Sequence, residues 1–143
     1  MEKGTVGLIT NGAGLGLATL DNIDALGGGV SGFQNVGGVA FHEQISFLIE
    51  LMGSDDQTKV LFVNCAGGMK DMESLAIIFI DACKFGLNNG KPIIIRLKGR
   101  SDRQAYERLR SFNSSQPRPV FLIEDDFNKA CALAVDMANE LNF

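Results

Sequence analysis

The chain has 143 residues, of which 45% are hydrophobic and 21% charged, and its formal net charge is -4. This length suits one domain of about 100–200 residues, and the composition excludes a disordered chain. The acidic balance, with no basic cluster beyond Lys98-Gly99-Arg100, argues against nucleic-acid binding, and no run approaches the ~18 apolar residues of a membrane span.

Strands and helices alternate through the first half of the chain. The apolar run Val6–Thr10 predicts a strand, and leucine and isoleucine then recur at helical spacing from Leu17 to Leu26. Residues 30–36 predict a weaker strand, and residues 42–52 a helix. The β-branched and aromatic run at 59–63 is typical of a strand covered on both faces, which predicts a central position in a sheet.

The second half continues the alternation. Residues 69–85 predict a helix, 92–97 a buried strand, 102–112 a charged and exposed helix, 120–123 the last strand, and 125–141 a closing helix. Five strands alternating with five helices require a parallel sheet with right-handed crossovers. The expected fold is α/β: a three-layer, doubly wound, five-stranded parallel sheet of the flavodoxin-like kind.

Glycines gather where the predicted strands end. The clusters are Asn11-Gly12-Ala13-Gly14-Leu15-Gly16, Val36-Gly37-Gly38 and Asn64-Cys65-Ala66-Gly67-Gly68. Each opens into a helix, so several helix N-termini with bare backbone N–H groups should meet at one edge of the sheet, an arrangement that attracts anions. The first cluster does not fit the dinucleotide fingerprint, because its third glycine falls one residue early.

Four segments together resemble one family. They are residues 9–15, 33–38 and 63–68, with Arg96-Leu97-Lys98-Gly99 as the fourth. In order and spacing they are similar to the C-terminal CoA-ligase domain of the succinyl-CoA synthetase β subunit and its ATP-citrate lyase relatives. The resemblance covers residues 6 to 139, nearly the whole chain.

The resemblance implies a single CoA-ligase domain, residues 1–143, in which the ATP-grasp and CoA-binding parts are absent. Such a domain binds substrate and faces a phosphohistidine, in a ligase that converts carboxylate, CoA and NTP to acyl-CoA, as in the tricarboxylic acid cycle. The implied partners are an α subunit or region that carries the phosphohistidine, an ATP-grasp domain, a small dicarboxylate and, as a further option, a second copy in a homodimer. We expect no nucleic-acid or membrane partner.

The resemblance also divides the chemistry among the parts. It places no catalytic residue in this chain alone, which we therefore expect to be inactive by itself. The domain would bind no cofactor of its own, whereas ATP or GTP, Mg and CoA serve the full assembly. The odd count of three cysteines suits a reduced compartment, and the family indicates cytoplasm or mitochondrial matrix. Carried over by position, the substrate- or phosphate-binding residues are Asn11, Gly12, Gly14, Asn64, Gly67, Gly68 and Arg96.

Four residues allow more than one interpretation. Asp71 stands where the family usually has arginine, and its charge would repel an anion unless Lys70 compensates. Arg96 could pair with substrate or form a structural ion pair. Cys65 is either a packing residue or a thiol activated near a helix N-terminus. His42 is expected to be exposed or capping, and not the phosphohistidine.

Other functions compete with the ligase interpretation. A non-catalytic binding or assembly module that keeps the fold is favoured by Asp71. An electron carrier or a response regulator fits the fold but not the loops. No metal site is expected, because the acidic residues fall on helix faces or first turns, where they complement the helix dipole: Asp21, Asp24, Glu43, Glu124 and Asp125.

Overall fold

The protein is a parallel sheet sandwiched between two layers of helices. The computed structural model describes residues 4–37, 42–67 and 71–141. The five strands of these residues lie in the order β2-β1-β3-β4-β5. Their bounds are Val6–Thr10 for β1, Val30–Asn35 for β2, Val60–Ala66 for β3, Ile93–Lys98 for β4 and Phe121–Ile123 for β5. The helices are α1 at Ala13–Ala25, α2 at His42–Ser54, α3 at Met72–Lys84, α4 at Asp102–Ser114 and α5 at Phe127–Leu141.

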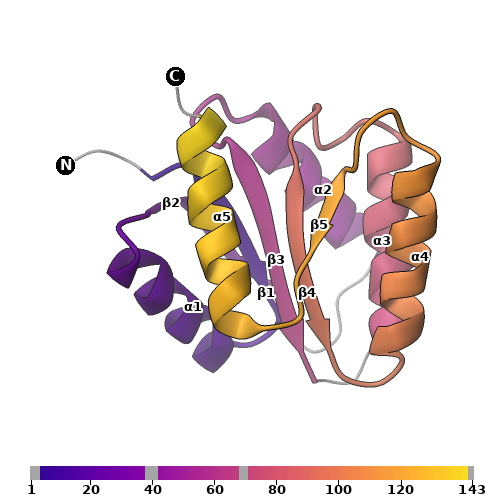
Figure 1. Cartoon of the computed structure of the whole chain (residues 1–143), viewed down its shortest axis with the longest axis horizontal. Coiled ribbons are helices and arrows are strands. Elements are labelled where there is room, and N and C mark those ends of the chain that lie inside the picture. The colour runs from indigo at the N-terminus through magenta and orange to yellow at the C-terminus, as the bar shows by residue number, and fades with distance from the viewer. Residues whose placement is uncertain (1–3, 38–41, 68–70, 142–143) are drawn as a thin grey trace.

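Two apolar clusters, one on each face of the sheet, hold the layers together. Helices α1 and α5 cover one face and α2, α3 and α4 the other (Figure 1). Strand β3 is buried along its length up to Cys65, because it lies between β1 and β4 and is covered on both faces. The strand order and the two helical layers confirm the expected doubly wound α/β fold.

Several boundaries differ from the predicted ones. Helix α5 begins at Phe127, two residues later than predicted, because the Asp126 carboxylate accepts the Lys129 N–H at 2.9 Å and so caps the helix. Helix α3 is described from Met72, whereas the predicted start at Met69 lies outside the described residues. Strands β3 and β4 extend beyond their predicted ends, to Ala66 and Lys98.

Helix α4 corrects the expectation of a solvated helix. Four of its side chains are buried against α3 and the sheet, while its charged residues face outward; the buried ones are Ala105, Tyr106, Leu109 and Phe112. Leu109 follows Ala105 by four residues and Tyr106 by three, and Phe112 follows Leu109 by three, so the four share one helical face. The sequence contained this amphipathic pattern, but the many charged residues of the segment made it less apparent.

A tyrosine completes the sheet where β5 stops. The last β4–β5 pair joins Ile95 and Ile123, so Leu97 has no partner on that side. The Tyr106 hydroxyl accepts the Leu97 N–H at 3.0 Å and donates to the Leu97 carbonyl. Burial raises the pKa of Tyr106, which keeps the hydroxyl protonated as a donor.

Among the described residues, no helix has the length and apolar character that crossing a membrane requires.

Candidate functional site

The described parts of the loops that follow β1 and β3 lie side by side at the carboxyl edge of the sheet, as expected for parallel strands (Figure 1). Asn11 joins the two. Its Oδ1 accepts the Ala66 N–H at 2.9 Å, and its Nδ2 donates to the Ala66 carbonyl at 3.3 Å. The Asn11 side-chain amide therefore bonds to both backbone groups of Ala66, as a neighbouring strand would. It holds together the loops that follow β1 and β3.

Gly12 is the turn that leads into α1. Its φ of 150° is a conformation that residues with a side chain rarely adopt, and its N–H donates to Asn35 Oδ1 at 2.8 Å. The same Asn35 oxygen accepts the Gly37 N–H at 3.0 Å. The expectation of a bare N–H at Gly12 is therefore wrong, because Asn35 at the end of the neighbouring strand already satisfies it.

The first turn of α1 is open. Within the described residues, no side chain caps this helix and no acceptor contacts the N–H groups of Ala13, Gly14 and Leu15. Gly14 is exposed, and a Cβ built on it would meet nothing within 4 Å. The first N–H groups of a helix have no partner inside the helix and carry its positive dipole end. This turn can therefore accept an anion.

Backbone N–H groups at the start of α3 already donate to acceptors within the chain. Asp71 Oδ1 accepts the Ser74 N–H at 3.0 Å, and Oδ2 accepts the Ser74 hydroxyl at 2.8 Å. The Met72 N–H donates to the Arg100 carbonyl at 2.8 Å. The hydrogen bond from the Ser74 N–H is the main reason that the pKa of Asp71 is lowered. Asp71 is thus an N-cap, which the spacing Asp-x-x-Ser before an apolar helix could have indicated.

The loop between β3 and α3 offers fewer donors than expected. The Gly67 N–H donates to the Lys98 carbonyl at 2.7 Å, so it is not bare either. Gly68 and Lys70 lie outside the described residues. The Asp71 carboxylate lies where an anion would approach the start of α3.

Asn64 and Arg96 belong to one hydrogen-bonded chain. Asn64 is fully buried, its Nδ2 donates to the Thr19 hydroxyl at 3.0 Å, and its Oδ1 accepts Arg96 Nη1 at 2.9 Å. Arg96 Nε donates to the Asp125 carbonyl at 3.0 Å, and the guanidinium lies 5.6 Å from the Phe127 ring centroid. These bonds link α1, β3, β4 and the segment before α5.

We considered a structural ion pair for Arg96 from the sequence, but the two acceptors of its guanidinium described above are both neutral. Among the described residues, the carboxylate of Asp125 pairs instead with Lys98 Nζ at 3.6 Å. Asn64 was expected to contact ligand, but its side chain is turned toward Thr19 of α1. Asn64 and Arg96 are neighbours in the β3–β4 register, and this contact could not be predicted because the strand was expected to end at residue 63.

His42 and Cys65 lie in different environments, the first at the surface and the second in the core. His42 begins α2 and is half-exposed, with Nε2 3.3 Å from Asp81 Oδ2, as expected for a surface residue. Cys65 is fully buried, and burial raises its thiol pKa to about 12, so an activated thiol at this position is excluded. Across the described ranges, no three acidic, cysteine or histidine residues cluster to hold a metal ion.

Comparison of the sequence with known proteins finds one family model and related β subunits. The family model described as CoA-ligase matches residues 9–115. The chain is 38% identical over 109 residues to the β subunit of an ADP-forming succinate–CoA ligase of Campylobacter curvus, covering 76% of this chain and 28% of that protein. It is 34% identical over 138 residues to a hydrogenosomal β subunit of the same description from Neocallimastix frontalis, covering 96% of this chain and 30% of that protein. The chain thus spans about a third of the length of these relatives.

Solved structures share the fold at lower identity. A protein of Pyrococcus horikoshii OT3 superposes with a TM-score of 0.78 at 18% identity, covering 99% of this chain and 37% of that one. An ATP citrate lyase of Methanosaeta concilii, solved with (3S)-citryl-CoA, gives 0.75 at 17% identity, covering 93% and 37%. At such identities the likeness establishes the architecture.

Proposed function

Because this chain belongs to the CoA-ligase family, as a CoA-ligase domain of the succinyl-CoA synthetase type, we propose that it is the substrate-binding, phosphohistidine-facing domain of an acid–CoA ligase. The complete reaction would join a small carboxylate to CoA at the expense of a nucleoside triphosphate. This chain would position the carboxylate or the phosphoryl group, and partner regions would supply the nucleotide site and the phosphohistidine.

The open first turn of α1 carries this proposal. It presents the N–H groups of Ala13, Gly14 and Leu15 at the carboxyl edge of the sheet, without a side-chain cap and with no Cβ at position 14. Three N–H donors and a helix dipole stabilise a carboxylate or phosphoryl oxygen without any cation from the chain. A small dicarboxylate is the substrate class that suits this turn and the family.

Residues 1–143 would serve as one domain of a larger assembly. The relatives are β subunits of ADP-forming ligases and are about three times as long as this chain, which supports an ATP-grasp partner and an α subunit. ATP or GTP, Mg and CoA would bind in those parts. A hydrogenosomal relative beside bacterial ones supports cytoplasm or an organelle matrix as the location.

Asp71 supports a second candidate, a non-catalytic binding or assembly module. Its carboxylate accepts the Ser74 N–H and hydroxyl at the start of α3, the helix that the resemblance directs at the phosphohistidine. A phosphoryl group there would meet a negative charge and donors already in use. A domain that has lost phosphoryl transfer could keep the fold and the α1 turn.

Titration of the isotope-labelled chain with succinate and with phosphate, followed by amide NMR, separates the candidates. Ligand binding is expected to shift the amides of residues 13–15, and loss of these shifts in Gly14→Val would assign them to the α1 turn. If the wild type binds neither anion while Asp71→Ala binds phosphate at residues 72–74, the second candidate replaces the first. Asp136→Ala removes an exposed charge on α5 and controls for net charge.

Turnover provides an independent test. The chain alone, with ATP or GTP, Mg, CoA and succinate, is expected to form no acyl-CoA, because the phosphorylated histidine and the nucleotide site belong to other parts. Succinyl-CoA formation by the purified chain would contradict this division of labour.

A further inference from the structure

Two asparagine–glycine pairs in this chain differ in how the fold holds them. They are Asn11-Gly12, at the carboxyl edge of the sheet, and Asn89-Gly90, in the turn between α3 and β4. Asparagine is thermolabile, and a following glycine makes it more so, because no side chain keeps the glycine nitrogen away from the asparagine side-chain carbonyl. Whether such a pair reacts then depends on the hydrogen bonds that hold both residues.

The first pair is held by hydrogen bonds on both of its reacting groups. The Asn11 side-chain amide bonds to the N–H and the carbonyl of Ala66, and the Gly12 N–H donates to Asn35 Oδ1 at 2.8 Å. The two residues become free only when the segments that follow β1, β2 and β3 separate. Because β1 and β3 are inner strands of the sheet, such an opening is rare.

The second pair lies open to water. Asn89 and Gly90 are both exposed, and among the residues that the structure describes the Gly90 N–H contacts no acceptor. A Cβ built on Gly90 would meet nothing within 4 Å. The turn is closed by a hydrogen bond from the Lys91 N–H to the Asn88 carbonyl at 3.0 Å. Opening of this turn therefore breaks a few surface hydrogen bonds and leaves the sheet intact.

The Asn89 side chain caps the end of α2. Its Nδ2 donates to the Gly53 carbonyl at 3.2 Å, and Lys91 Nζ donates to the Met52 carbonyl at 3.1 Å. The last carbonyls of a helix have no partner within the helix, and these two donors supply one. The turn also packs closely on the helix, since a Cβ built on Gly53 would lie 2.2 Å from the Leu87 carbonyl oxygen.

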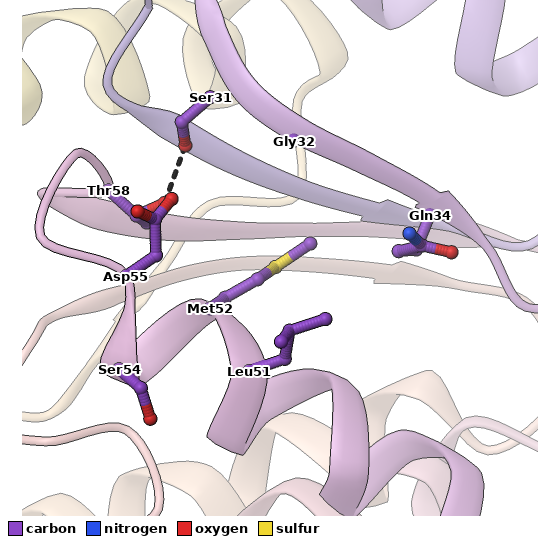
Figure 2. A pocket seen from close by; sticks show the side chains of 8 residues that line it. All are labelled: Ser31, Gly32, Gln34, Leu51, Met52, Ser54, Asp55 and Thr58. Atoms are coloured by element: carbon purple, nitrogen blue, oxygen red, sulfur yellow. Dashed lines mark hydrogen bonds between the residues drawn. The ribbon is translucent and has the colours of Figure 1, made fainter.

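The same end of α2 forms one wall of a groove. Figure 2 shows Leu51 and Met52 of α2 pointing toward the strands, with Gly32 of β2 above them. The groove measures about 400 Å³. Met52 is buried in this wall, so the position of the last turn of α2 decides whether its apolar side chain stays covered.

We propose that Asn89 is a site of spontaneous deamidation, and that this modification removes the cap from α2. The Gly90 nitrogen attacks Cγ of Asn89, a bond forms between these two atoms, and Nδ2 leaves as ammonia with the proton of the Gly90 nitrogen. Water then opens the resulting succinimide. Attack at Cγ leaves aspartate, and attack at the backbone carbonyl carbon leaves isoaspartate. Water is the only co-reactant, and nothing is oxidised or reduced.

Both products disturb the contact with α2. A carboxylate at position 89 has no proton to donate to the Gly53 carbonyl, and it lies at the end of the helix where the dipole is negative. Isoaspartate also lengthens the backbone of a turn that already packs closely on Gly53. The uncapped last turn of α2 then frays, and Met52 loses part of its cover in the groove.

Incubation of the native chain in mildly alkaline buffer, followed by digestion and tandem mass spectrometry, tests the modification. The peptide that contains Asn89 should gain about 1 Da and appear as aspartate and isoaspartate forms. Asn89 should convert at least about tenfold faster than Asn11, because its turn opens locally. In urea, where both pairs are free, the two rates should become similar.

Asn89→Gln is the matched control, because glutamine keeps the amide but forms the corresponding ring much more slowly. The mass gain of this peptide should disappear in the variant, and an undiminished gain would assign the reaction to Asn88 and overturn the proposal. A native chain in which Asn89 stays unmodified while the urea-treated chain reacts overturns it too. So does a native chain in which Asn11 converts as fast as Asn89.

Hydrogen exchange of Asn89→Asp, which reproduces the aspartate product, tests the loss of the cap. The amides of residues 52–54 should exchange at least about tenfold faster than in the wild type, since the last turn of α2 opens more often. Gln104→Glu adds the same charge at an exposed position of α4 and should leave these amides unchanged. Unchanged exchange in Asn89→Asp, or an equal effect of Gln104→Glu, would overturn the proposed effect on α2.

Discussion

Replacement of Asn64 by alanine should destabilise the fold through a polar network inside the core. The substitution removes a neutral hydrogen bond to Thr19, worth about 1 kcal/mol, and one from the Arg96 guanidinium, worth about 1.5–3 kcal/mol. Arg96 is partly exposed, so water recovers some of the second contribution, whereas Thr19 is fully buried and recovers nothing. We expect the free energy of unfolding to fall by about 2–3 kcal/mol.

Urea denaturation followed by circular dichroism measures this loss. With a slope of about 1–3 kcal/mol per molar urea, the midpoint should move down by about 0.7–3 M. Asn22→Ala is the matched control, because Asn22 donates to Asn128 at 2.8 Å on the surface, and its loss should cost less than about 0.5 kcal/mol. Equal losses in the two variants, or an unchanged midpoint for Asn64→Ala, would refute the assignment of Asn64 and Arg96 to a structural network.

Other predictions concern the helix starts and a buried thiol. The lowered pKa of Asp71 means that its cap stabilises the fold fully above the unfolded-state value of 3.8 and loses this effect as pH falls through the folded-state value; the stability gap between wild type and Asp71→Ala, measured by thermal unfolding, should therefore close in acid. Burial raises the pKa of Cys65 from 9.0 to about 12, so stability should decline as pH rises from 9 toward 12, and alkylation of Cys65 at neutral pH should require unfolding; rapid labelling of the native chain would contradict this. Gly14→Ala should raise the free energy of unfolding by up to about 1 kcal/mol because the helical site is open, while Gly12→Ala should lower it because of the φ of 150°; chemical denaturation of the pair checks the opposite signs.

The fold could be predicted from the sequence because its signals are local and repeated. Apolar runs such as Val6–Thr10 alternate with helical periodicity, and this alternation permits few topologies. The wrong predictions concern segments in which one feature of the sequence obscured another. Helix α4 was expected to be exposed because its charged residues concealed the stripe that includes Leu109, and α5 was expected two residues early because Asp126 was not identified as its cap.

The candidate site could be predicted only in outline. The meeting of the glycine loops follows from parallel strands, but the state of each N–H depends on an acceptor distant in sequence. The Gly12 N–H is satisfied by Asn35, 23 residues away, and the Gly67 N–H by the Lys98 carbonyl. Such pairings depend on the side-by-side arrangement of strands, which periodicity does not specify. The role of Asp71 was different, because its cap is local and the sequence carried the signal.

The hydroxyl of Tyr106 connects two parts of the fold. It bonds both backbone groups of Leu97, and the next residue, Lys98, accepts the Gly67 N–H in the loop before α3. A single oxygen therefore ties the first turns of α4 to the end of β4, and from there to the loop that leads into α3. A displacement of α4 would strain the bonds to Leu97 and, through the next residue, the Gly67–Lys98 hydrogen bond; Tyr106→Phe, which lacks the hydroxyl, would disconnect α4 from the end of β4.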